Sequence, residues 1–333
     1  MSLELSLRPG LVLVVGPNGV GKTNLLESLH VATQGFSPRT HHDGQAIRFG
    51  SDAARVAVSG MRGSSTVRAE VTLRVGRPKE ARLNGAPLAS AELLRRSLAT
   101  LVFTPDRLAI VKGGPASRRA YVDRALARIY PGRASVPQEY AATLAQRNAG
   151  LRRVQLGFSD AASLEPWTER VAKLGASLVA ARRETLELLS PGFGAHASEL
   201  GLADAQLVYD AEPPTVDALE ARLDRDVQRA STGLGPHLDD VAIVSGARDL
   251  RRYGSQGEQR LAVLSLLLAE ADLLDPPPLL LLDDVLSELD PGRRALLVER
   301  ISSRGQTVVT ATHRSALPVD PAQVVEVEPG TAR

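Results

Sequence analysis

The order of apolar and polar positions predicts a buried strand followed by a helix near the start of the chain. Residues 11–15 read LVLVV, a short apolar run of the kind found in buried strands. A glycine-rich turn follows, and then the segment TNLLESLHVAT, in which Leu25, Leu26, Leu29 and Ala32 recur with helical spacing. This part of the chain therefore predicts a strand, a turn and a helix that packs one face onto a core.

Alternating residues predict a second sheet further along. Stretches near 55–59, 66–74 and 80–83 alternate between apolar and polar residues, and Asn84-Gly85 is a hairpin turn signal. We therefore expect an antiparallel sheet in this region.

The middle of the chain has a composition that is typical of helices. From about residue 90 to 230 it is rich in Ala, Leu, Arg and Glu, with expected breaks at Pro131-Gly132, Pro166 and Pro191-Gly192. No heptad pattern is sustained, so we expect no long coiled coil.

The last hundred residues return to an alternation of strands and helices. Strand character resumes at 239–253. We then expect a helix at 256–274, a strand at 279–283, a helix at 291–302 and a strand at 306–311. The fold class is thus α/β: one lobe with a mixed sheet from residues 1–100 and 232–333, and an inserted, mainly helical lobe from residues 101–231.

Composition narrows the function classes. The 333 residues contain no cysteine, which excludes disulfides and cysteine-based zinc sites and favours a reducing, cytoplasmic location. No apolar run is long enough to span a membrane. Aromatic residues make up 3%, which argues against a surface that stacks single-stranded bases. Of the 40 basic residues 36 are arginine, which a GC-rich genome would favour, although arginine also suits phosphate contacts.

The turn after the first strand is a phosphate-binding motif. It fits G-x-x-x-x-G-K-[ST] without a mismatch and lies between a predicted strand and a predicted helix: Gly16-Pro17-Asn18-Gly19-Val20-Gly21-Lys22-Thr23. Backbone N–H groups freed by the glycines and the helix N-terminus would surround phosphates. We expect Lys22 to reach the β- and γ-phosphates of ATP as a catalytic residue, and the Thr23 hydroxyl to ligate Mg²⁺.

A second motif joins four leucines to two carboxylates. Residues 279–284 read LLLLDD, which predicts a buried parallel strand that ends at a polar site. We expect Asp283 to hold Mg²⁺ and Asp284 to orient or deprotonate the attacking water. An ordinary strand end with loop carboxylates is the alternative, and the phosphate-binding motif makes it the weaker one.

Three further segments fit an ATPase of the ABC kind. Ser255-Gln256-Gly257-Glu258 precedes an apolar helix and is both a capping box and a match to the ABC signature, which would bind the γ-phosphate held by a second protomer. Ser287 to Pro291 provides a helix start at Asp290-Pro291 and matches the D-loop. His313 follows the strand after the D-loop helix and matches the switch histidine.

Beyond these motifs, the chain resembles the RecF family. The resemblance covers roughly residues 10–315 and rests on several segments: Phe36–Thr40 with Ile47–Gly50, Val102–Leu108, Val111–Pro115 with Arg118–Asp123, Gln146-Arg147-Asn148, Gly235–Asp240 and Tyr253–Arg260. The chain starts at Met1-Ser2-Leu3, almost inside the hairpin that leads into the P-loop in this family. Base contacts from the family's extra N-terminal strand are therefore expected to be missing.

The resemblance implies a slow, DNA-stimulated ATPase of DNA replication and repair. It implies a head-to-tail homodimer that closes on ATP and Mg²⁺, binds gaps and junctions of double- and single-stranded DNA, and works with RecR and RecO in recombinase loading and the SOS response to DNA damage. Duplex contacts are expected through phosphates. The candidate arginines come in pairs, each of which could equally be a solvated helix face: Arg118 and Arg119, Arg152 and Arg153, Arg182 and Arg183.

Two other functions fit part of the pattern. A transporter-type ATPase subunit shares the three motifs, but the long helical insertion between Lys22 and Asp283 is unusual for that class. A nucleotide-gated scaffold with negligible turnover uses the same binding residues, so phosphate release is the measurement that separates it from an ATPase.

Overall fold

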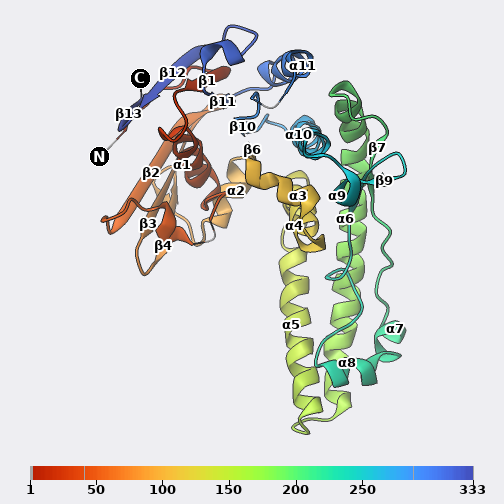
Figure 1. The fold of residues 1–333 in the computed structure, drawn as a ribbon. Helices are drawn as coiled ribbons and strands as arrows, with labels where there is room; N and C mark the ends of the chain where they lie inside the picture. Colours follow the sequence, from red (N-terminus) through yellow and green to blue (C-terminus); the bar gives the residue numbers. More distant parts are fainter. Residues whose placement is uncertain (1–2, 41, 288, 333) are drawn as a thin grey trace. The chain divides into compact units, whose positions relative to one another are not determined.

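The computed structural model describes residues 3–40, 42–287 and 289–332, so Met1, Ser2, His41, Glu288 of the predicted D-loop, and Arg333 lie outside the described part. The chain divides into two compact units (Figure 1). Unit 1 comprises Met1–Leu108, Ala195–Ala203 and Gln256–Arg333. Unit 2 comprises Ala109–Gly194 and Asp204–Ser255.

Unit 1 is built on a six-stranded mixed sheet of order β13-β12-β1-β11-β10-β6. Neighbouring strands are parallel except at the edge, where β13 runs antiparallel to β12. The strands are β1 (Leu11–Val15), β6 (Thr100–Phe103), β10 (Leu279–Leu282), β11 (Thr307–Ala311), β12 (Gln323–Glu328) and β13 (Thr331–Ala332). All five residues of β1 and of β11 are buried, which confirms the buried strand predicted at residues 11–15.

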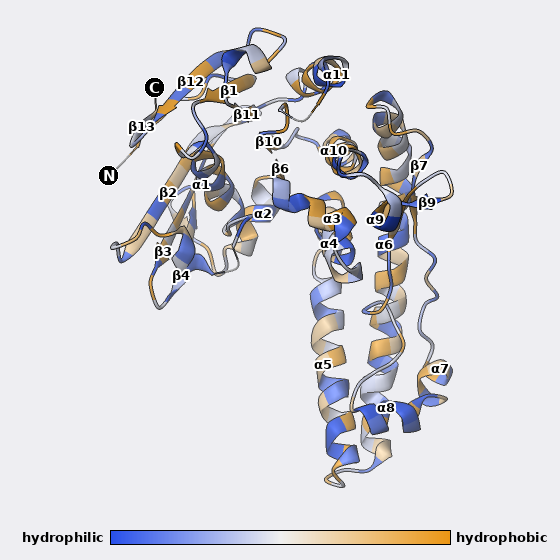
Figure 2. Ribbon diagram, in the orientation of Figure 1, coloured by the Kyte–Doolittle hydropathy of each residue, from blue (hydrophilic) through white to orange (hydrophobic). Residues whose placement is uncertain are grey.

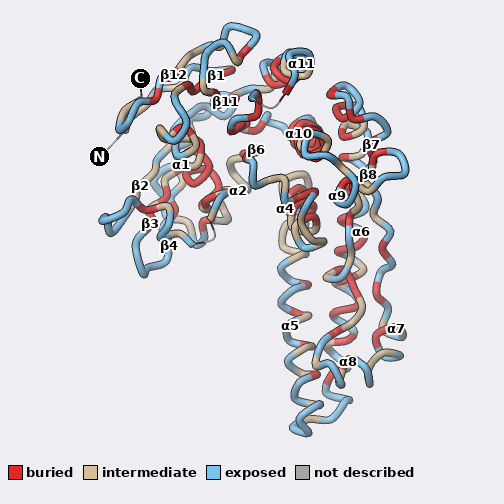
Figure 3. The backbone as a smooth tube through the Cα atoms, in the orientation of Figure 1, coloured by how far each residue is buried: buried red, intermediate tan, exposed pale blue. Residues whose placement is uncertain are grey.

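Helices accompany this sheet in unit 1. They are α1 (Lys22–Gln34), α2 (Glu92–Ser97), α10 (Gln256–Asp272) and α11 (Pro291–Ser302). From Leu261 to Ala271 every residue of α10 is buried, so this part of the helix is covered on all sides (Figure 3). Leu26 of α1 packs into the sheet core with Val12, Val14, Leu281 and Val308.

A second, antiparallel sheet in unit 1 has the order β2-β3-β4-β5. Its strands are β2 (Ala53–Arg62), β3 (Ser65–Arg74), β4 (Arg77–Leu83) and β5 (Ala86–Pro87). The predicted turn is confirmed, since Asn84 between β4 and β5 takes φ 51. One face of the sheet packs on α1 and α2.

Unit 2 consists mainly of helices. They are α3 (Ala109–Lys112), α4 (Pro115–Ile129), α5 (Val136–Gln155), α6 (Glu165–Glu199, whose last residues belong to unit 1), α7 (Val216–Glu220), α8 (Leu223–Arg229) and α9 (Leu250–Tyr253). A small sheet joins β7 (Ala205–Val208), β8 (Ala242–Ser245) and β9 (Arg248–Asp249). Apolar and polar residues alternate along α5 and α6 (Figure 2), and their apolar sides share one core with Leu126 and Leu219.

Short 3₁₀ segments link these elements. They are η1 (Asp43–Ala46), η2 (Pro105–Leu108), η3 (Pro131–Arg133), η4 (Ala161–Leu164) and η5 (Arg314–Ala316). The break expected at Pro131-Gly132 is therefore present, as η3.

Two features differ from the sequence-based expectation. The break expected at Pro191-Gly192 is wrong, because Pro191 lies inside α6. Leu189 and Phe193 are fully buried on either side of it, and this packing outweighs the backbone hydrogen bond that proline cannot make. In addition, the contacts group 232–255 with unit 2, whereas the sequence placed this stretch in the ATPase lobe. The physical reason is the antiparallel pairing of β8 with β7, a long-range contact that local patterns do not reveal.

Candidate functional site

The predicted site residues follow three neighbouring parallel strands. In the sheet β1 lies beside β11, and β11 lies beside β10, with Val15 opposite Ala311 and Leu282 opposite Val309. The P-loop therefore leaves the same edge of the sheet as Asp283 and the segment that contains His313. The carboxyl edge of a parallel sheet is where α/β proteins bind ligands.

The P-loop has the backbone that a phosphate cradle requires. Gly19 and Gly21 take φ values of 79 and 116, and a Cβ added at either position would meet no atom within 4 Å. Their left-handed conformation, not lack of space, therefore calls for glycine, and the space above the loop is open. At Gly16 a Cβ would come within 2.6 Å of the Val327 carbonyl oxygen, so a side chain is excluded there by close approach.

Lys22 is held over this loop at the start of α1. Its side chain donates hydrogen bonds from Nζ to the carbonyl oxygens of Gly16, at 2.7 Å, and of Pro17, at 2.9 Å. The residue is 8% exposed, so its ammonium group is largely removed from water. A lysine anchored in this way carries a positive charge at the mouth of a loop of backbone N–H groups, which is the charge that phosphates require.

Thr23 and Asp283, both predicted to ligate Mg²⁺, are brought together. The Thr23 hydroxyl donates to Asp283 Oδ2 at 2.9 Å across 260 positions of sequence. Asp283 is 6% exposed, and within the described residues it forms no ion pair. A buried carboxylate that is hydrogen-bonded only by neutral groups lacks a countercharge. An oxygen-ligated cation such as Mg²⁺ would supply that charge, so the residues fit the cofactor.

Asp284 turns away from the strand. It takes φ 49, a left-handed conformation that costs a non-glycine residue about 1 kcal/mol, and its side chain is exposed. The backbone is held there at both ends: the Asp284 N–H donates to Thr310 Oγ1 at 2.9 Å, and Ser287 Oγ donates to the Asp284 carbonyl at 3.0 Å. This conformation separates the exposed carboxylate of Asp284 from the buried one of Asp283.

Sequence reasoning missed Thr310, which links the two carboxylates. This fully buried residue of β11 donates from Oγ1 to Asp283 Oδ1 at 2.8 Å and accepts from the Asp284 N–H. The available signal was a hydroxyl inside the apolar run TVVTA, which could equally have been a residue satisfying its own backbone. Thr310 is therefore a positioning residue for both neighbours.

We expect Thr310→Val to weaken Mg²⁺-dependent nucleotide binding about tenfold, because valine keeps the volume but removes one hydrogen-bond donor to Asp283 and the acceptor of the Asp284 N–H. Thr310→Ser should restore binding. Titration of a fluorescent ATP analogue with and without Mg²⁺ measures the effect. Equal Mg²⁺ dependence in the wild type and the valine variant would contradict the role.

His313 and the signature segment are exposed. In the described part of the chain, the His313 side chain forms no hydrogen bond with Lys22, Asp283 or Asp284. Ser255, Gln256 and Gly257 are exposed around the first turn of α10, so the N-terminal end of this helix is open to solvent. The predicted cap of α11 is confirmed: Asp290 accepts from the Arg293 N–H at 3.0 Å, with Pro291 at the first position of the helix.

Two of the candidate arginines for DNA are structural. Arg118 and Arg182 are each 3% exposed and make two-pronged ion pairs, with Asp240 and Asp123 respectively. Burial works against the charge of Asp240, but the Arg118 hydrogen bond and charge hold the pKa of this carboxyl below its usual value. Such buried pairs do not present their guanidinium groups to a polyanion.

The other four candidates have different surroundings. Arg119 donates to the Asp239 carbonyl, and Arg183 donates to the Ala211 carbonyl. Arg152 and Arg153 are exposed at the end of α5. Only this last pair keeps both side chains on the surface.

Unit 2 also contains a neutral histidine, His237. His237 Nε2 lies 2.9 Å from the Thr232 carbonyl and must donate to it, so Nδ1 accepts from the Tyr140 hydroxyl at 2.7 Å. Burial lowers the pKa of His237 below its ordinary 6.5, and the charge of Arg119 acts in the same direction. The Thr232 carbonyl and the more weakly coupled carboxylates of Asp239 and Asp226 oppose the shift.

We expect this histidine to make the fold sensitive to mild acid. Because its folded pKa is depressed, the stability it contributes is complete above pH 6.5 and is lost as pH falls through the folded pKa. The melting temperature, measured from pH 8 to 5, should fall more steeply with decreasing pH in the wild type than in His237→Gln, whose side chain cannot titrate. Parallel profiles for the two proteins would rule out this assignment.

Comparison with known proteins places these features in a family. The family model of the RecF/RecN/SMC N terminal domain matches residues 1–329. The chain is 36% identical to the DNA replication and repair protein RecF of Heliobacterium modesticaldum, over 94% of this chain and 89% of that protein. It is 37% identical to RecF of Myxococcus xanthus, over 92% of this chain and 85% of that protein.

Comparison with solved structures points to the same family. The recombination mediator protein RecF with ATP, from the RecFOR pathway, superposes with a TM-score of 0.87 at 27% identity, over 99% of this chain and 92% of that one. An Smc head domain from Pyrococcus furiosus shares the fold, with a TM-score of 0.56 at 17% identity, over 97% of this chain and 89% of that one. Across the described residues, no helix combines the length and apolar character needed to cross a membrane. The P-loop, the paired carboxylates and these full-length similarities lead to one conclusion: the chain belongs to the RecF family of DNA replication and repair proteins.

Proposed function

We propose that this chain is an ATPase that binds DNA and acts in replication and repair. The observation that carries the proposal is the meeting of Thr23 with Asp283 beside Lys22 at one sheet edge. This arrangement fits Mg-ATP, and related proteins are named for DNA replication and repair. The RecF structures with ATP and with an ATP analogue support the same ligand.

Each residue has a distinct task in this proposal. Lys22 and the N–H groups of the P-loop bind the phosphates, and Thr23 with Asp283 holds the cation. When bound, Mg²⁺ supplies positive charge that lowers the cost of charge developing on the transferred phosphoryl group. Asp284, exposed and fixed by Thr310 and Ser287, orients the attacking water. His313 is proposed to act at the γ-phosphate once ATP is present.

The site is proposed to be completed by a second copy of the chain. The exposed first turn of α10, with Ser255, Gln256, Gly257 and Glu258, has the N–H groups and dipole that an anion on another protomer would need. A head-to-tail dimer would place this turn over the P-loop of its partner. The ATPase lobe and the inserted, mainly helical lobe expected from the sequence belong to the same proposal, with residues 232–255 assigned to the helical lobe.

The proposed partners and location are inferred from the relatives of the chain and from its composition. Mediators of the RecR and RecO kind are proposed as partners because the solved relatives are named as members of the RecFOR pathway. DNA gaps and junctions are proposed as the DNA partners, as the resemblance to the RecF family implies. A cytoplasmic location suits these partners and the cysteine-free sequence. A transport subunit has no support from these relatives.

Sedimentation of the chain on a gapped duplex, with and without Mg-ATP, tests the proposal. We expect an ATP-dependent shift to a DNA-bound dimer, together with DNA-stimulated phosphate release. A shift without phosphate release would favour the nucleotide-gated scaffold. Failure to bind either ATP or DNA would refute the proposal.

A further inference from the structure

The antiparallel sheet of unit 1 has one apolar and one charged face. Along β3, Ala69, Val71 and Leu73 are buried against α1 and α2. The alternate positions point away from that core, because side chains of a strand alternate between faces. The outward positions of the three long strands are mostly polar or charged: Arg55, Ser59, Arg68, Glu70, Thr72, Arg74, Glu80 and Arg82.

The strand register gathers three guanidinium groups around one carboxylate. Glu70 lies opposite Arg82 on β4, and Arg55 Nη2 donates to Glu70 Oε2 at 2.7 Å. The Arg55 hydrogen bond, with smaller contributions from the charges of Arg55, Arg68 and Arg82, holds the pKa of the Glu70 carboxyl below its usual value. One negative charge thus faces three positive ones at the centre of the sheet.

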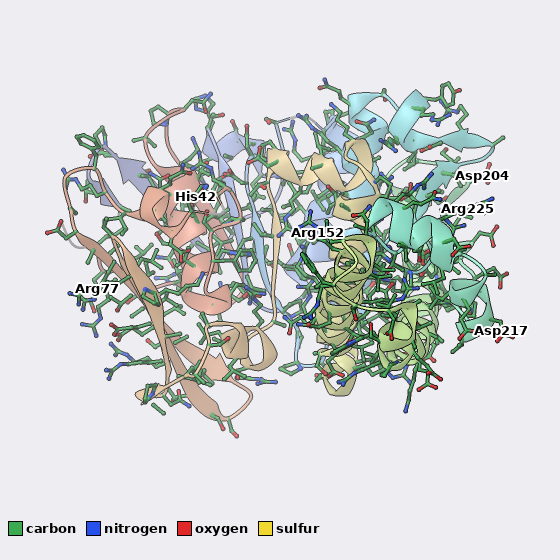
Figure 4. All side chains as sticks on the ribbon, turned by 90° about the horizontal axis from the view of Figure 1, so that it is seen from below. His42, Arg77, Arg152, Asp204, Asp217 and Arg225 are labelled. Atoms are coloured by element: carbon green, nitrogen blue, oxygen red, sulfur yellow. The ribbon has the colours of Figure 1, made fainter. Side chains whose placement is uncertain are left out.

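The face as a whole has excess positive charge. The four arginines Arg55, Arg68, Arg74 and Arg82 share the face with two glutamates, and the second of these, Glu80, lies 3.7 Å from Arg74. Arg77 lies opposite Arg74 at the end of the sheet and adds to the excess (Figure 4). The arginines of these pairs are exposed, with 64% of the Arg55 side chain in solvent, so they can contact a phosphate.

The side chains of this face favour contact with a phosphate backbone over stacking of bases or binding of a protein partner. The strands contain no Phe, Tyr or Trp, so bases cannot stack on them. The outward positions between Arg55 and Arg82 include few large apolar side chains of the kind that anchor a protein partner, Met61 being one at the far end of β2. Arg68 and Arg82 lie on neighbouring strands, offset by two positions in the register, so their guanidinium groups can contact neighbouring phosphates.

We propose that the outward face of β2, β3 and β4 binds the phosphate backbone of duplex DNA, with Arg68 and Arg82 as its central contacts. This inference rests on the proposed function and assigns the DNA contact that the buried Arg118 and Arg182 cannot make. Binding through this face is independent of sequence, because phosphates carry no base identity.

Duplex binding by Arg68→Ala/Arg82→Ala, measured by fluorescence anisotropy in Mg-ATP over a range of salt concentrations, tests the inference. We expect roughly a tenfold loss of affinity near 0.1 M salt and a salt slope smaller by about two, one for each lost phosphate contact. Arg68→Lys/Arg82→Lys keeps both charges and should retain most of the affinity. ATP-analogue binding should be unchanged in both variants, since neither residue lies at the P-loop.

Arg152→Ala/Arg153→Ala is the matched control, because it removes two exposed arginines from unit 2. Loss of affinity in this control with none in the sheet variant would overturn the inference and move the contact to α5. Wild-type affinity in the sheet variant would also overturn it and leave the face to an acidic protein partner. A wild-type chain that binds ATP but no DNA would refute the proposed function itself, and the inference with it.

Discussion

Lys22→Met is expected to abolish nucleotide binding under conditions in which the wild-type chain is saturated. Methionine keeps the buried stem of the side chain but removes the ammonium group that donates to the carbonyls of Gly16 and Pro17 and that would contact the phosphates. A charge-assisted hydrogen bond to an anion contributes about 1.5–3 kcal/mol, so we expect affinity to fall by about 100-fold. Equilibrium titration with a fluorescent ATP analogue measures this loss.

The control for this variant is Lys173→Ala, because Lys173 is exposed on α6 in unit 2. It should bind the analogue as the wild type does. A thermal melt of Lys22→Met shows whether the P-loop remains folded, since the substitution also frees two carbonyl groups. Near wild-type affinity in a folded Lys22→Met protein would contradict the role given to the lysine.

The elements that the sequence predicted correctly are those with local signals. The strand at Leu11–Val15 and the helix at Pro291–Ser302 begin and end where their runs of apolar residues, caps and prolines indicate. The P-loop was predictable for the same reason, because its eight residues are contiguous and must form one turn. Asp283 was recognisable as a candidate for the same local reason, because a polar pair directly follows an apolar strand.

The features that the sequence could not give depend on distant pairings. Thr310 matters because β11 lies beside β10, and the strand itself contains no sign of that neighbour. From the sequence, Arg118 was a candidate DNA contact. Its partner Asp240 lies 122 positions away, so the ion pair could not be recognised without the fold. The basic face of β2 to β4 also needed the strand register, since Arg55, Glu70 and Arg82 are separated in sequence and meet only in the sheet.

Asp284→Asn is expected to separate ATP binding from hydrolysis. Asparagine tolerates the left-handed conformation at φ 49 and keeps the backbone N–H that donates to Thr310, so the fold of the site should persist. The variant loses only the carboxylate that would accept a proton from water, a contribution of about 100-fold to 10,000-fold in rate. We therefore expect normal affinity for ATP, phosphate release at least about 100-fold slower, and an ATP-bound dimer that persists.

Single-turnover phosphate release and light scattering in saturating Mg-ATP measure these two effects in the same sample. Asp320→Asn, which alters a carboxylate whose side chain is 96% exposed, is the control and should behave as the wild type. An Asp284→Asn protein that binds ATP but stays monomeric would contradict the proposed dimer. If it hydrolysed ATP at the wild-type rate, the water would have to be oriented by another residue at this sheet edge, and the exposed His313 would be the first to replace.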